Sequence, residues 1–325
     1  MGILLLNEGH VRSAAPELRG VVSLVEQAYR LDSEGKADVP TKIGVHPGYP
    51  NSFLHAMPAW VDDVRALGVK WISYFPGNLR RGIPDSSGVI ILNSPDDGRP
   101  CCVMEGMHVT FLRTAACAAI AAKHLLASPP KSLGLVGCGG LGLWSLRIMG
   151  TVFPSIERVM VSSRSPESRA SFCAERSSEG PWSLIPVDQA DEAVRDVDLL
   201  VSSVPPADVR PVRGEILGPQ TLFIPLDLTN SWDDAVMQKA ERVVADNPGH
   251  FSTRVQSARG SRFPALAHID RLQDLVSGRT ERGTLDQRTV VAICGIASTD
   301  MVLGWDIYRR ALKAGIGLKF DLNDG

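Results

Sequence analysis

The residues best suited to chemistry are three cations and one carboxylate. Lys42, Lys70 and Arg113 fall in the first part of the chain, and Asp227 directly follows the apolar run TLFIPL. Cationic side chains can neutralise and orient a substrate carboxylate. A carboxylate at the end of a sheet strand can exchange a proton with a substrate nitrogen or stabilise an iminium. Taken alone, the two lysines are more typical of a solvated surface, and Asp227 is equally typical of a residue that caps a strand.

Arg113 begins the alanine-rich run RTAACAAIAAKHLLA, whose composition predicts a helix. A cation at the start of a helix is disfavoured by the helix dipole unless it binds an anion. We therefore predict an anion-binding role for Arg113. We also expect this helix to connect two domains.

A glycine-rich turn, GCGGLG, lies between the apolar run LGLVG and the helical pattern LWSLRIMGTVF. Its spacing, Gly137-x-Gly139-x-x-Gly142, is a nucleotide-binding pattern that also occurs by chance. A strand before it and a helix after it give it weight, because a helix amino terminus presents N–H groups to a pyrophosphate. We expect Gly137, Gly139, Gly140 and Leu141 to bind a dinucleotide. The alternative is a tight turn that only lets the helix pack on the strand.

The next predicted strand, RVMVSS, ends at Ser162-Ser163-Arg164 without an acidic residue. An acid at this place would accept a hydrogen bond from the ribose of NAD, whereas an arginine beside hydroxyl groups suits a 2′-phosphate. Ser163 and Arg164 therefore favour NADP(H), with NAD(H) as the alternative. Arg164 is otherwise an ordinary surface residue.

Composition excludes several classes of protein. The chain has 325 residues, 44% hydrophobic and 22% charged, with a formal net charge of −2, so we expect no nucleic-acid partner. Six cysteines without a C-x-x-C pair indicate a reducing compartment.

The amino-terminal MGILLLNEGH has no basic flank or cleavage site and is expected to be a strand of a cytoplasmic protein. No apolar run is long enough to span a membrane, and the histidines show no metal-ligand spacing, so we expect neither membrane nor metal.

Two domains are predicted. From LGLVG to TVVAICGIA, strands alternate with helical patterns, which indicates a doubly wound parallel sheet of the Rossmann type over residues 117–302. Residues 1–116 mix short strands with one amphipathic helix over 16–36, and the helical pattern in 303–325 is expected to return to them. The expected fold class is α/β, a Rossmann domain joined to an α+β domain. The polar stretch 250–285 shows no clear pattern.

The order of motifs along the chain resembles the ornithine cyclodeaminase/μ-crystallin family. The matching motifs are PTK, HAMPAW, GVKW, FPGN, FLRTAACAAIAAKHLL, GLVGCGG, SSRSPES, DLLVSS, PLD and GIASTD. The resemblance implies a homodimer in which the α+β part binds substrate and forms the dimer. The activities it implies include amino-acid cyclodeamination, amino-acid dehydrogenation, cyclic-imine reduction and steps on opine-like secondary amines.

The resemblance also assigns substrate-binding positions. Lys42 matches a basic residue that holds the substrate carboxylate, and Lys70 matches a lysine near the reacting carbon. Met57 lies close to the substrate in the family pattern. Asp227 matches the catalytic aspartate, so Asp227 and Lys70 are the expected catalytic residues. Gly295 matches backbone that lines the substrate and nicotinamide pocket.

Cofactor contacts are assigned in the same way. Arg113 matches an arginine that reaches both the cofactor phosphates and the substrate, and Thr114 lies beside it. Gly139 and Gly140 match the pyrophosphate loop. The resemblance adds four positions that it places around the cofactor: Ser203, Val204, Asp227 and Cys294.

Two departures from ornithine cyclodeaminase decide between activities. Ser231 stands where that enzyme has a lysine, and Ser163 stands where it has an acid on the NAD ribose. We therefore predict an NAD(P)H-dependent oxidoreductase acting on the CH–NH bond of an amino acid, imino acid or amino-acid conjugate. The alternatives are a cyclodeaminase with no net cofactor oxidation and a μ-crystallin-like protein that binds NADP(H) and a small ligand.

Overall fold

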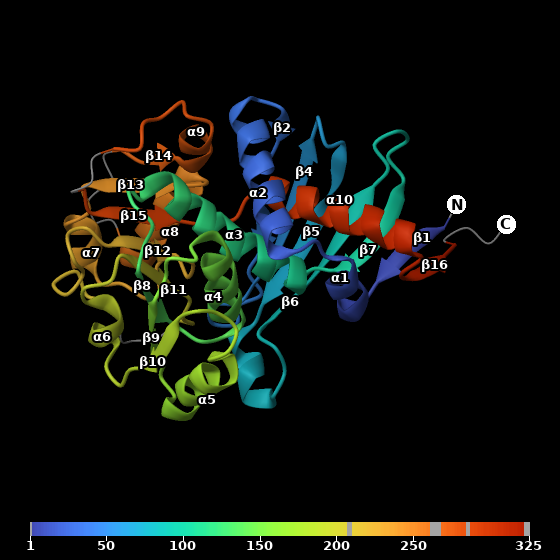
Figure 1. Ribbon diagram of the computed structural model, residues 1–325. Helices are drawn as coiled ribbons and strands as arrows, with labels where there is room; N and C mark the ends of the chain where they lie inside the picture. The colour runs from blue at the N-terminus through green and yellow to red at the C-terminus, as the bar shows by residue number, and fades with distance from the viewer. Residues whose placement is uncertain (1, 207–209, 261–267, 284–286, 322–325) are drawn as a thin grey trace. The chain divides into compact units, whose positions relative to one another are not determined.

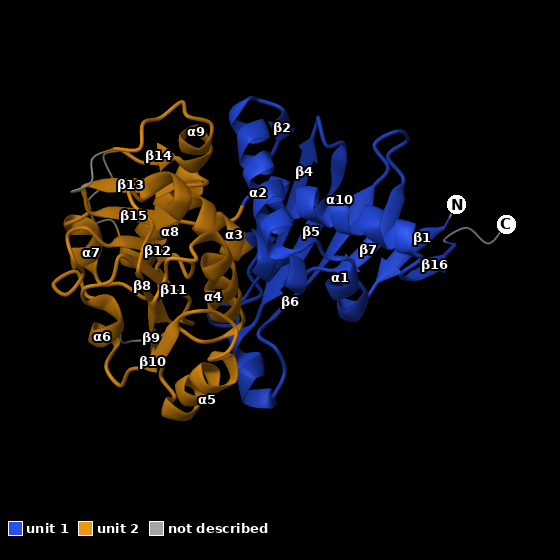
Figure 2. Ribbon diagram, viewed as in Figure 1, with its two compact units in different colours: residues 1–113, 296–325 blue, residues 114–295 orange. Residues whose placement is uncertain are grey.

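The computed structural model describes residues 2–206, 210–260, 268–283 and 287–321, which belong to two compact units (Figure 2). Unit 1 combines residues 1–113 with 296–325, and unit 2 spans residues 114–295. Unit 1 is therefore discontinuous in sequence and is built from both ends of the chain.

Unit 1 is a mixed sheet with helices packed on it (Figure 1). The strands run in the order β16-β1-β7-β6-β5-β4-β2, and β3 pairs with β4. The predicted helix over 16–36 is present as α2, and the closing helix is present as α10. The elements are β1 (Ile3–Leu6), α1 (Glu8–Ala14), α2 (Leu18–Ser33), β2 (Ala37–Asp38), β3 (Ile43–Val45), β4 (Phe53–Val61), β5 (Ala66–Tyr74), the 3-10 helix η1 (Pro76–Arg81), β6 (Ser86–Asn93), β7 (Pro100–Glu105), α10 (Ala297–Ala314) and β16 (Leu318–Phe320).

Alternation along β4 and β5 gives this sheet two different faces, because successive side chains of a strand point to opposite sides. Met57 of β4 lies directly opposite Lys70 of β5, and both are buried on the face toward α10. Pro58 and Val69, the next pair in register, are half-buried on the other face. Trp71 on that second face is 44% exposed. Lys70 is thus held on the helix-covered side of the sheet.

Unit 2 contains a parallel sheet in the order β10-β9-β8-β11-β12-β15-β13-β14 (Figure 1). The elements are α3 (Met107–Leu125), which begins in unit 1, β8 (Ser132–Val136), α4 (Gly140–Val152), β9 (Arg158–Ser162), α5 (Pro166–Arg176), β10 (Ser183–Pro186), α6 (Ala190–Val194), β11 (Leu199–Ser202), β12 (Leu222–Pro225), α7 (Asp234–Gln238), β13 (Arg242–Ala245), α8 (Pro248–Arg259), β14 (Asp270–Arg271), α9 (Leu272–Val276) and β15 (Thr289–Ala292).

The strand order reverses at β8. From β8 the chain first adds β9 and β10 on one side and then adds β11 and β12 on the other. In a doubly wound sheet the crevice for ligands lies at this reversal, beyond the carboxyl ends of the strands. The central strands β8, β11 and β12 are buried along their whole length, as their continuous apolar sequences require. The predicted α/β fold is confirmed.

One local prediction is wrong. Helix α3 begins at Met107, so Arg113 lies in its second turn rather than at its start. The backbone N–H groups of Met107 and His108 donate to the Glu105 carboxylate, 2.5 and 3.0 Å away. Glutamate is not a residue that typically precedes a helix. The first residues of α3 also suit a strand, so the sequence pattern of β7 continues without a visible break. The dipole argument for Arg113 therefore fails.

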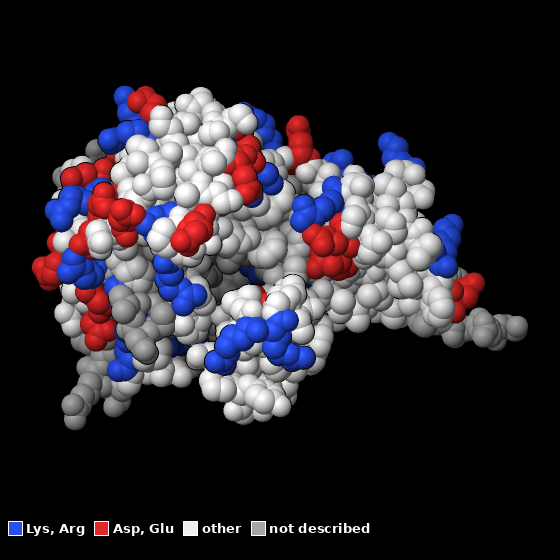
Figure 3. Space-filling view, turned by 90° about the horizontal axis from the view of Figure 1, so that it is seen from below, with Lys and Arg blue, Asp and Glu red and all other residues white. Residues whose placement is uncertain are grey.

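Part of the polar stretch 250–285 is also ordered into elements. It contains most of α8 together with β14 and α9, while residues 261–267 and 284–285 lie outside the described residues. Within the described ranges no helix is long and apolar enough to cross a membrane, and no group of three or more His, Cys, Asp or Glu residues is arranged to hold a metal ion. Acidic and basic side chains are intermingled over much of the surface seen in Figure 3.

Candidate active site

The glycine-rich turn sits at the carboxyl end of β8, beside the strand reversal. Gly137 has a φ of 106°, a conformation that side chains disfavour, and a Cβ there would lie 2.4 Å from the carbonyl oxygen of Ser203. The Ser203 N–H donates to the Val136 carbonyl over 2.8 Å, which fixes this close approach. Gly137 is thus required by the turn itself.

Gly139 and Gly140 have a different character, because they are exposed and open to a ligand. A Cβ at Gly139 would meet nothing within 4 Å, and Gly139 is the N-cap of α4, with no side chain bound to the free N–H groups of the first turn. Ser203 has a buried hydroxyl with no hydrogen-bond partner among the described residues. Leu141, in the first turn of α4, is half-buried. Free N–H groups and an open approach fit a pyrophosphate.

The end of β9 supplies the residues expected near an adenosine ribose. Ser163 is half-buried, and its hydroxyl donates to the Ser165 carbonyl over 2.8 Å. Arg164 is exposed, and no hydrogen bond or ion pair to another described residue holds its guanidinium. By contrast, Arg169 is buried, donates to the Ser163 carbonyl and pairs with Asp188. Arg164 is therefore the basic side chain that remains available for an anion at this strand end.

Asp227 lies at the same sheet edge, two residues beyond β12. Its Oδ2 accepts the Val204 N–H over 3.1 Å, and its Oδ1 accepts both the N–H and the hydroxyl of Ser231, over 3.1 and 2.9 Å. The Ser231 hydroxyl also lies 2.7 Å from that of Ser202. Burial raises the pKa of the Asp227 carboxyl, while these hydrogen bonds act in the opposite direction. These hydrogen bonds fix the carboxylate in place, and its burial favours the protonated form.

The loop after Asp227 is held in a strained shape. Leu228 has a φ of 59°, which a non-glycine residue rarely adopts. Its carbonyl accepts the indole N–H of Trp232, and the Arg259 guanidinium stacks 4.4 Å above the Trp232 ring. Arg210 donates to the Thr229 carbonyl over 2.9 Å. Such strain persists only where the surroundings enforce it, so the fold fixes the direction of the Asp227 side chain.

Cys294 and Gly295 follow β15 and are held by a residue that the sequence did not single out. The buried Asp246, at the end of β13, accepts the Cys294 N–H at 2.7 Å and the Gly295 N–H at 2.9 Å, one on each carboxylate oxygen. Cys294 is 9% exposed. Asp246 therefore fixes the backbone stretch for which the family resemblance predicts a place beside the nicotinamide.

In unit 1, Lys70 and Arg113 meet at a buried carboxylate. Lys70 Nζ lies 2.7 Å from Asp300 Oδ1, and Arg113 Nε lies 3.0 Å from the same oxygen. Thr110 Oγ1 is 3.5 Å from Lys70 Nζ. The side chains of Lys70 and Asp300 are fully buried. Burial and the Arg113 charge lower the pKa of Lys70 to about 7, against the opposing effect of Asp300.

Lys42 and Met57 belong to the same part of unit 1. The half-buried Lys42 is close enough for its charge to contribute to the lowered pKa of Lys70. Met57 is buried opposite Lys70 on the neighbouring strand. Thr114 follows Arg113 in α3 and is buried. The cations predicted from sequence thus gather in unit 1, and Asp300 is the member that sequence reasoning missed.

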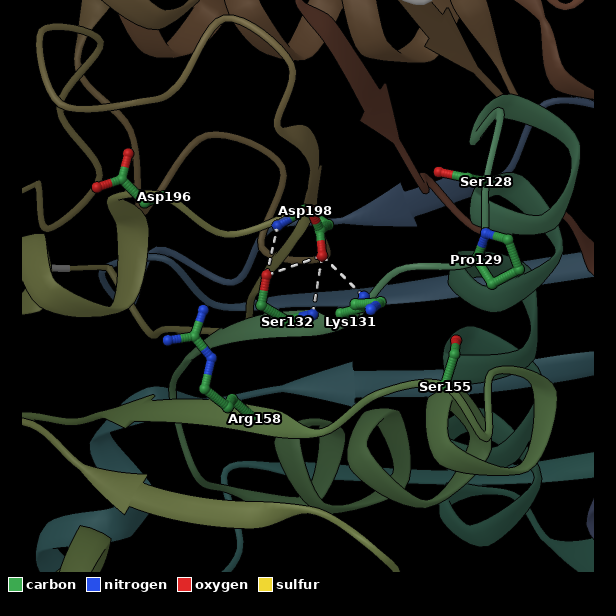
Figure 4. A pocket seen from close by; sticks show the side chains of 8 residues that line it. All are labelled: Ser128, Pro129, Lys131, Ser132, Ser155, Arg158, Asp196 and Asp198. Carbon is green, nitrogen blue, oxygen red and sulfur yellow. Dashed lines mark hydrogen bonds between the residues drawn. The ribbon is translucent and has the colours of Figure 1, made fainter.

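A pocket of about 630 Å³ in unit 2 lies elsewhere (Figure 4). It sits at the amino ends of β8 and β9, the edge of the sheet opposite the glycine turn. Asp198 there accepts hydrogen bonds from the Lys131 N–H, the Ser132 N–H and the Ser132 hydroxyl, at 2.7 to 2.9 Å. Asp198 directly precedes β11, so its carboxylate links the start of β11 to the start of β8. The residues that line the pocket are Ser128, Pro129, Lys131, Ser132, Ser155, Arg158, Asp196 and Asp198.

Comparison with known proteins decides the family. The model of the ornithine cyclodeaminase/mu-crystallin family matches residues 11–315. The chain belongs to this family. It is 28% identical over 298 residues to the nodulation efficiency protein NfeD of Rhizobium meliloti, covering 91% of each chain.

Two solved structures resemble the whole chain. One is Δ1-pyrroline-2-carboxylate reductase of Thermococcus litoralis in complex with NADH and L-proline, with a TM-score of 0.89, 26% identity and coverage of 97% of this chain and 99% of that one. The other is an archaeal alanine dehydrogenase dimer with bound NAD, with a TM-score of 0.88, 27% identity and coverage of 99% and 100%. The family and the full-length fold predicted from sequence are thus confirmed.

Proposed function

We propose that this protein is an NAD(P)H-dependent oxidoreductase acting on the CH–NH bond of an amino acid or imino acid. The observation that carries the proposal is the connection between the glycine turn and Asp227. Ser203 packs on Gly137, and the adjacent Val204 N–H binds the Asp227 carboxylate. Asp227, which can exchange a proton, is thereby held at the same edge of the sheet as the glycine turn that would bind a pyrophosphate. The NADH-bound reductase and the NAD-bound dehydrogenase that share this fold support the assignment.

The cofactor would be held by unit 2. Gly137, Gly139 and Gly140 would receive the pyrophosphate, with Leu141 and Ser203 beside it. Arg164 and Ser163 favour the 2′-phosphate of NADP(H), because a guanidinium binds phosphate through paired charge-assisted hydrogen bonds. Cys294 and Gly295, fixed by Asp246, would line the nicotinamide. The two structural relatives are bound to NADH and NAD, which supports a nicotinamide cofactor; the preference for NADP(H) rests on Ser163 and Arg164.

The substrate carboxylate would be held by Lys70, Arg113 and Lys42. Two cations around one carboxylate leave positive charge in a buried cluster, and a bound anion offsets it. Met57 would contact the apolar part of the substrate. Holding the carboxylate fixes the α-carbon, which is the atom that gives or receives hydride.

Asp227 would manage the proton at the substrate nitrogen. When bound, the nicotinamide supplies the hydride donor or acceptor. In the reductive direction, protonated Asp227 would donate its proton to the imine nitrogen, which leaves the adjacent carbon electron-poor. In the oxidative direction, ionised Asp227 accepts the proton that the amine releases. Burial raises the pKa of this carboxyl, which favours the protonated form that the reductive direction needs.

The test is a substrate panel followed by nicotinamide absorbance. The purified protein is mixed with NADPH or NADH and with cyclic imino acids, or with α-keto acids and ammonia, and separately with L-proline or L-alanine and the oxidised cofactors. We expect turnover of at least one carboxylate-bearing imine, faster with NADPH. Ammonia release from ornithine or lysine with unchanged absorbance would instead identify a cyclodeaminase. Cofactor binding without any turnover would identify a binding protein.

We also propose a homodimer formed through the outer face of the unit 1 sheet. This face carries a set of half-buried or exposed apolar side chains from neighbouring strands, an arrangement typical of an interface. The archaeal relative of the same fold is a dimer. The set comprises Leu54, Ala56, Pro58, Trp60, Leu67, Val69, Trp71, Val89 and Ile91.

All six cysteines lie in the described residues and none forms a disulfide, which supports the proposal of a cytoplasmic location.

A further inference from the structure

Asp300 is a buried carboxylate shared by two cations that are distant from it in sequence. It lies in the first turn of α10, and its side chain is fully buried. A single oxygen, Oδ1, receives both Lys70 Nζ from β5 and Arg113 Nε from α3, at 2.7 and 3.0 Å. Three separate elements of unit 1 therefore converge on one atom.

The position of Asp300 on its helix suits a permanent anion. The amino-terminal turn of a helix carries partial positive charge, which stabilises a nearby carboxylate. Aspartate also has a short side chain with little freedom, so its oxygen is fixed once α10 packs on the sheet. The long side chains of Lys70 and Arg113 would otherwise choose among many rotamers.

Charge balance makes this contact essential to the cluster. When Lys70 is protonated, Lys70 and Arg113 bring two positive charges into the interior, and the nearby Lys42 adds to the repulsion. Removing one partner of a buried ion pair leaves an uncompensated buried charge and is strongly destabilising. Asp300 offsets one of the two buried charges.

We propose that Asp300 is a positioning residue for substrate binding: it aims Lys70 and Arg113 and offsets one of their two charges, so that together they accept a carboxylate. This rests on the proposed function, in which these two cations hold the substrate. Asp300 acts through its neighbours, and we assign it no contact with the reacting atoms.

The charge of Asp300 also contributes to the pKa of Lys70. Burial, Arg113 and Lys42 all lower the pKa of Lys70, and Asp300 raises it; Thr110 is the uncharged neighbour on α3. Without the carboxylate, the Lys70 pKa falls below its present value of about 7. Lys70 is then neutral at neutral pH and attracts a carboxylate less strongly, and acidification restores its charge.

The test compares D300N with D300E and with D306N. Asp306 lies on the same helix and pairs with Arg309 and Arg310 at the surface, so D306N is a matched loss of one carboxylate. Two quantities are measured: the titration midpoint of the Lys70 ammonium by nitrogen NMR of lysine-labelled protein, assigned with K70R, and the pH dependence of KM. The NMR measurement needs no substrate.

For D300N we expect a midpoint at least about one pH unit lower and a KM at least about tenfold higher at neutral pH. The KM increase should shrink on acidification, with kcat and cofactor affinity changed much less. D300E should restore the midpoint, and D306N should match the unaltered protein. The proposal is overturned if D300N lowers Tm but leaves both the Lys70 midpoint and KM unchanged, or if D300E shifts the midpoint as far as D300N.

If D300N is too unstable to purify, K70M/D300N replaces it, because this pair removes one charge of each sign. Recovery of folding in the double variant is expected, and a double variant as unstable as D300N contradicts charge compensation. Failure of the proposed function gives a different result: no imine or amine is turned over by the unaltered protein, while the NMR comparison still reports on Asp300.

Discussion

Asp227 and Ser231 are joined by two hydrogen bonds that end on the same carboxylate oxygen, one from the Ser231 N–H and one from its hydroxyl. Both donate to the charged form of the carboxyl and so lower its pKa, while burial raises it. The side chain at position 231 is therefore a direct control on the proton affinity of the proposed acid–base group.

Ser231→Ala removes the hydroxyl but keeps the backbone bond. The pKa of Asp227 should rise by up to about one unit, because a hydrogen bond that favours the ionised form is lost. In the oxidative direction, which needs ionised Asp227, the acid limb of the kcat/KM profile should move to higher pH by the same amount. Ser155→Ala, at the opposite edge of the sheet, is the control. An unmoved limb would show that Asp227 is not the group being titrated.

Gly137→Ala and Gly139→Ala should separate folding from cofactor binding. At Gly137 the positive φ and the 2.4 Å approach to Ser203 oppose a methyl group, so the free energy of unfolding should fall by more than about 1 kcal/mol. At Gly139 a methyl group meets no protein atom, so stability should be kept while cofactor Kd rises at least about tenfold. Denaturant unfolding and fluorescence titration measure the two effects, with Gly249→Ala as control. Undiminished cofactor affinity in Gly139→Ala would argue for a packing turn.

Arg164→Ala tests cofactor selectivity. Losing a charge-assisted phosphate contact should weaken NADPH binding about ten- to hundredfold and leave NADH binding nearly unchanged. Arg158→Ala at the other end of the same strand should alter neither affinity. Equal weakening of both cofactors, or a preference of the unaltered protein for NADH, would contradict the NADP(H) assignment.

Trp71→Glu tests the proposed dimer face. A charge in the centre of an apolar interface should convert the dimer to a monomer, as sedimentation velocity would show. Leu312→Glu is the matched control, because Leu312 is 46% exposed on α10 against 44% for Trp71. Dissociation by the control alone would place the interface on the helical side of unit 1.

The sequence predicts the fold and the site best where one short continuous segment carries both the functional residues and the pattern of the strand or helix that positions them. Strand β8, the glycine turn and α4 are continuous, so their spacing alone indicates their shape. The sequence pattern puts the start of α3 at Arg113, six residues later than the structure does. Glu105 takes the place of a typical capping residue, and Val109 and Thr110 suit a strand equally well. Local signals are therefore reliable only when the boundary residues are typical ones.

Contacts between distant segments could not be predicted. Asp300 is 230 positions from Lys70 and 187 from Arg113, and a single chain carries no sign that they meet. Asp246 likewise contacts Cys294, 48 positions away, because β13 and β15 are neighbours in the sheet. In both cases the sequence identified the groups that are held and missed the aspartate that holds them.

The discontinuity of unit 1 has a consequence for synthesis of the chain. Residues 114–295 are continuous, whereas the face of the unit 1 sheet that carries Lys70 lacks its covering helix α10 until residues 297–314 have been made. Until then Lys70 and Arg113 have no Asp300 to pair with, and a core containing both cations is unfavourable. We therefore expect the nascent chain to complete its cation cluster only after α10 has emerged.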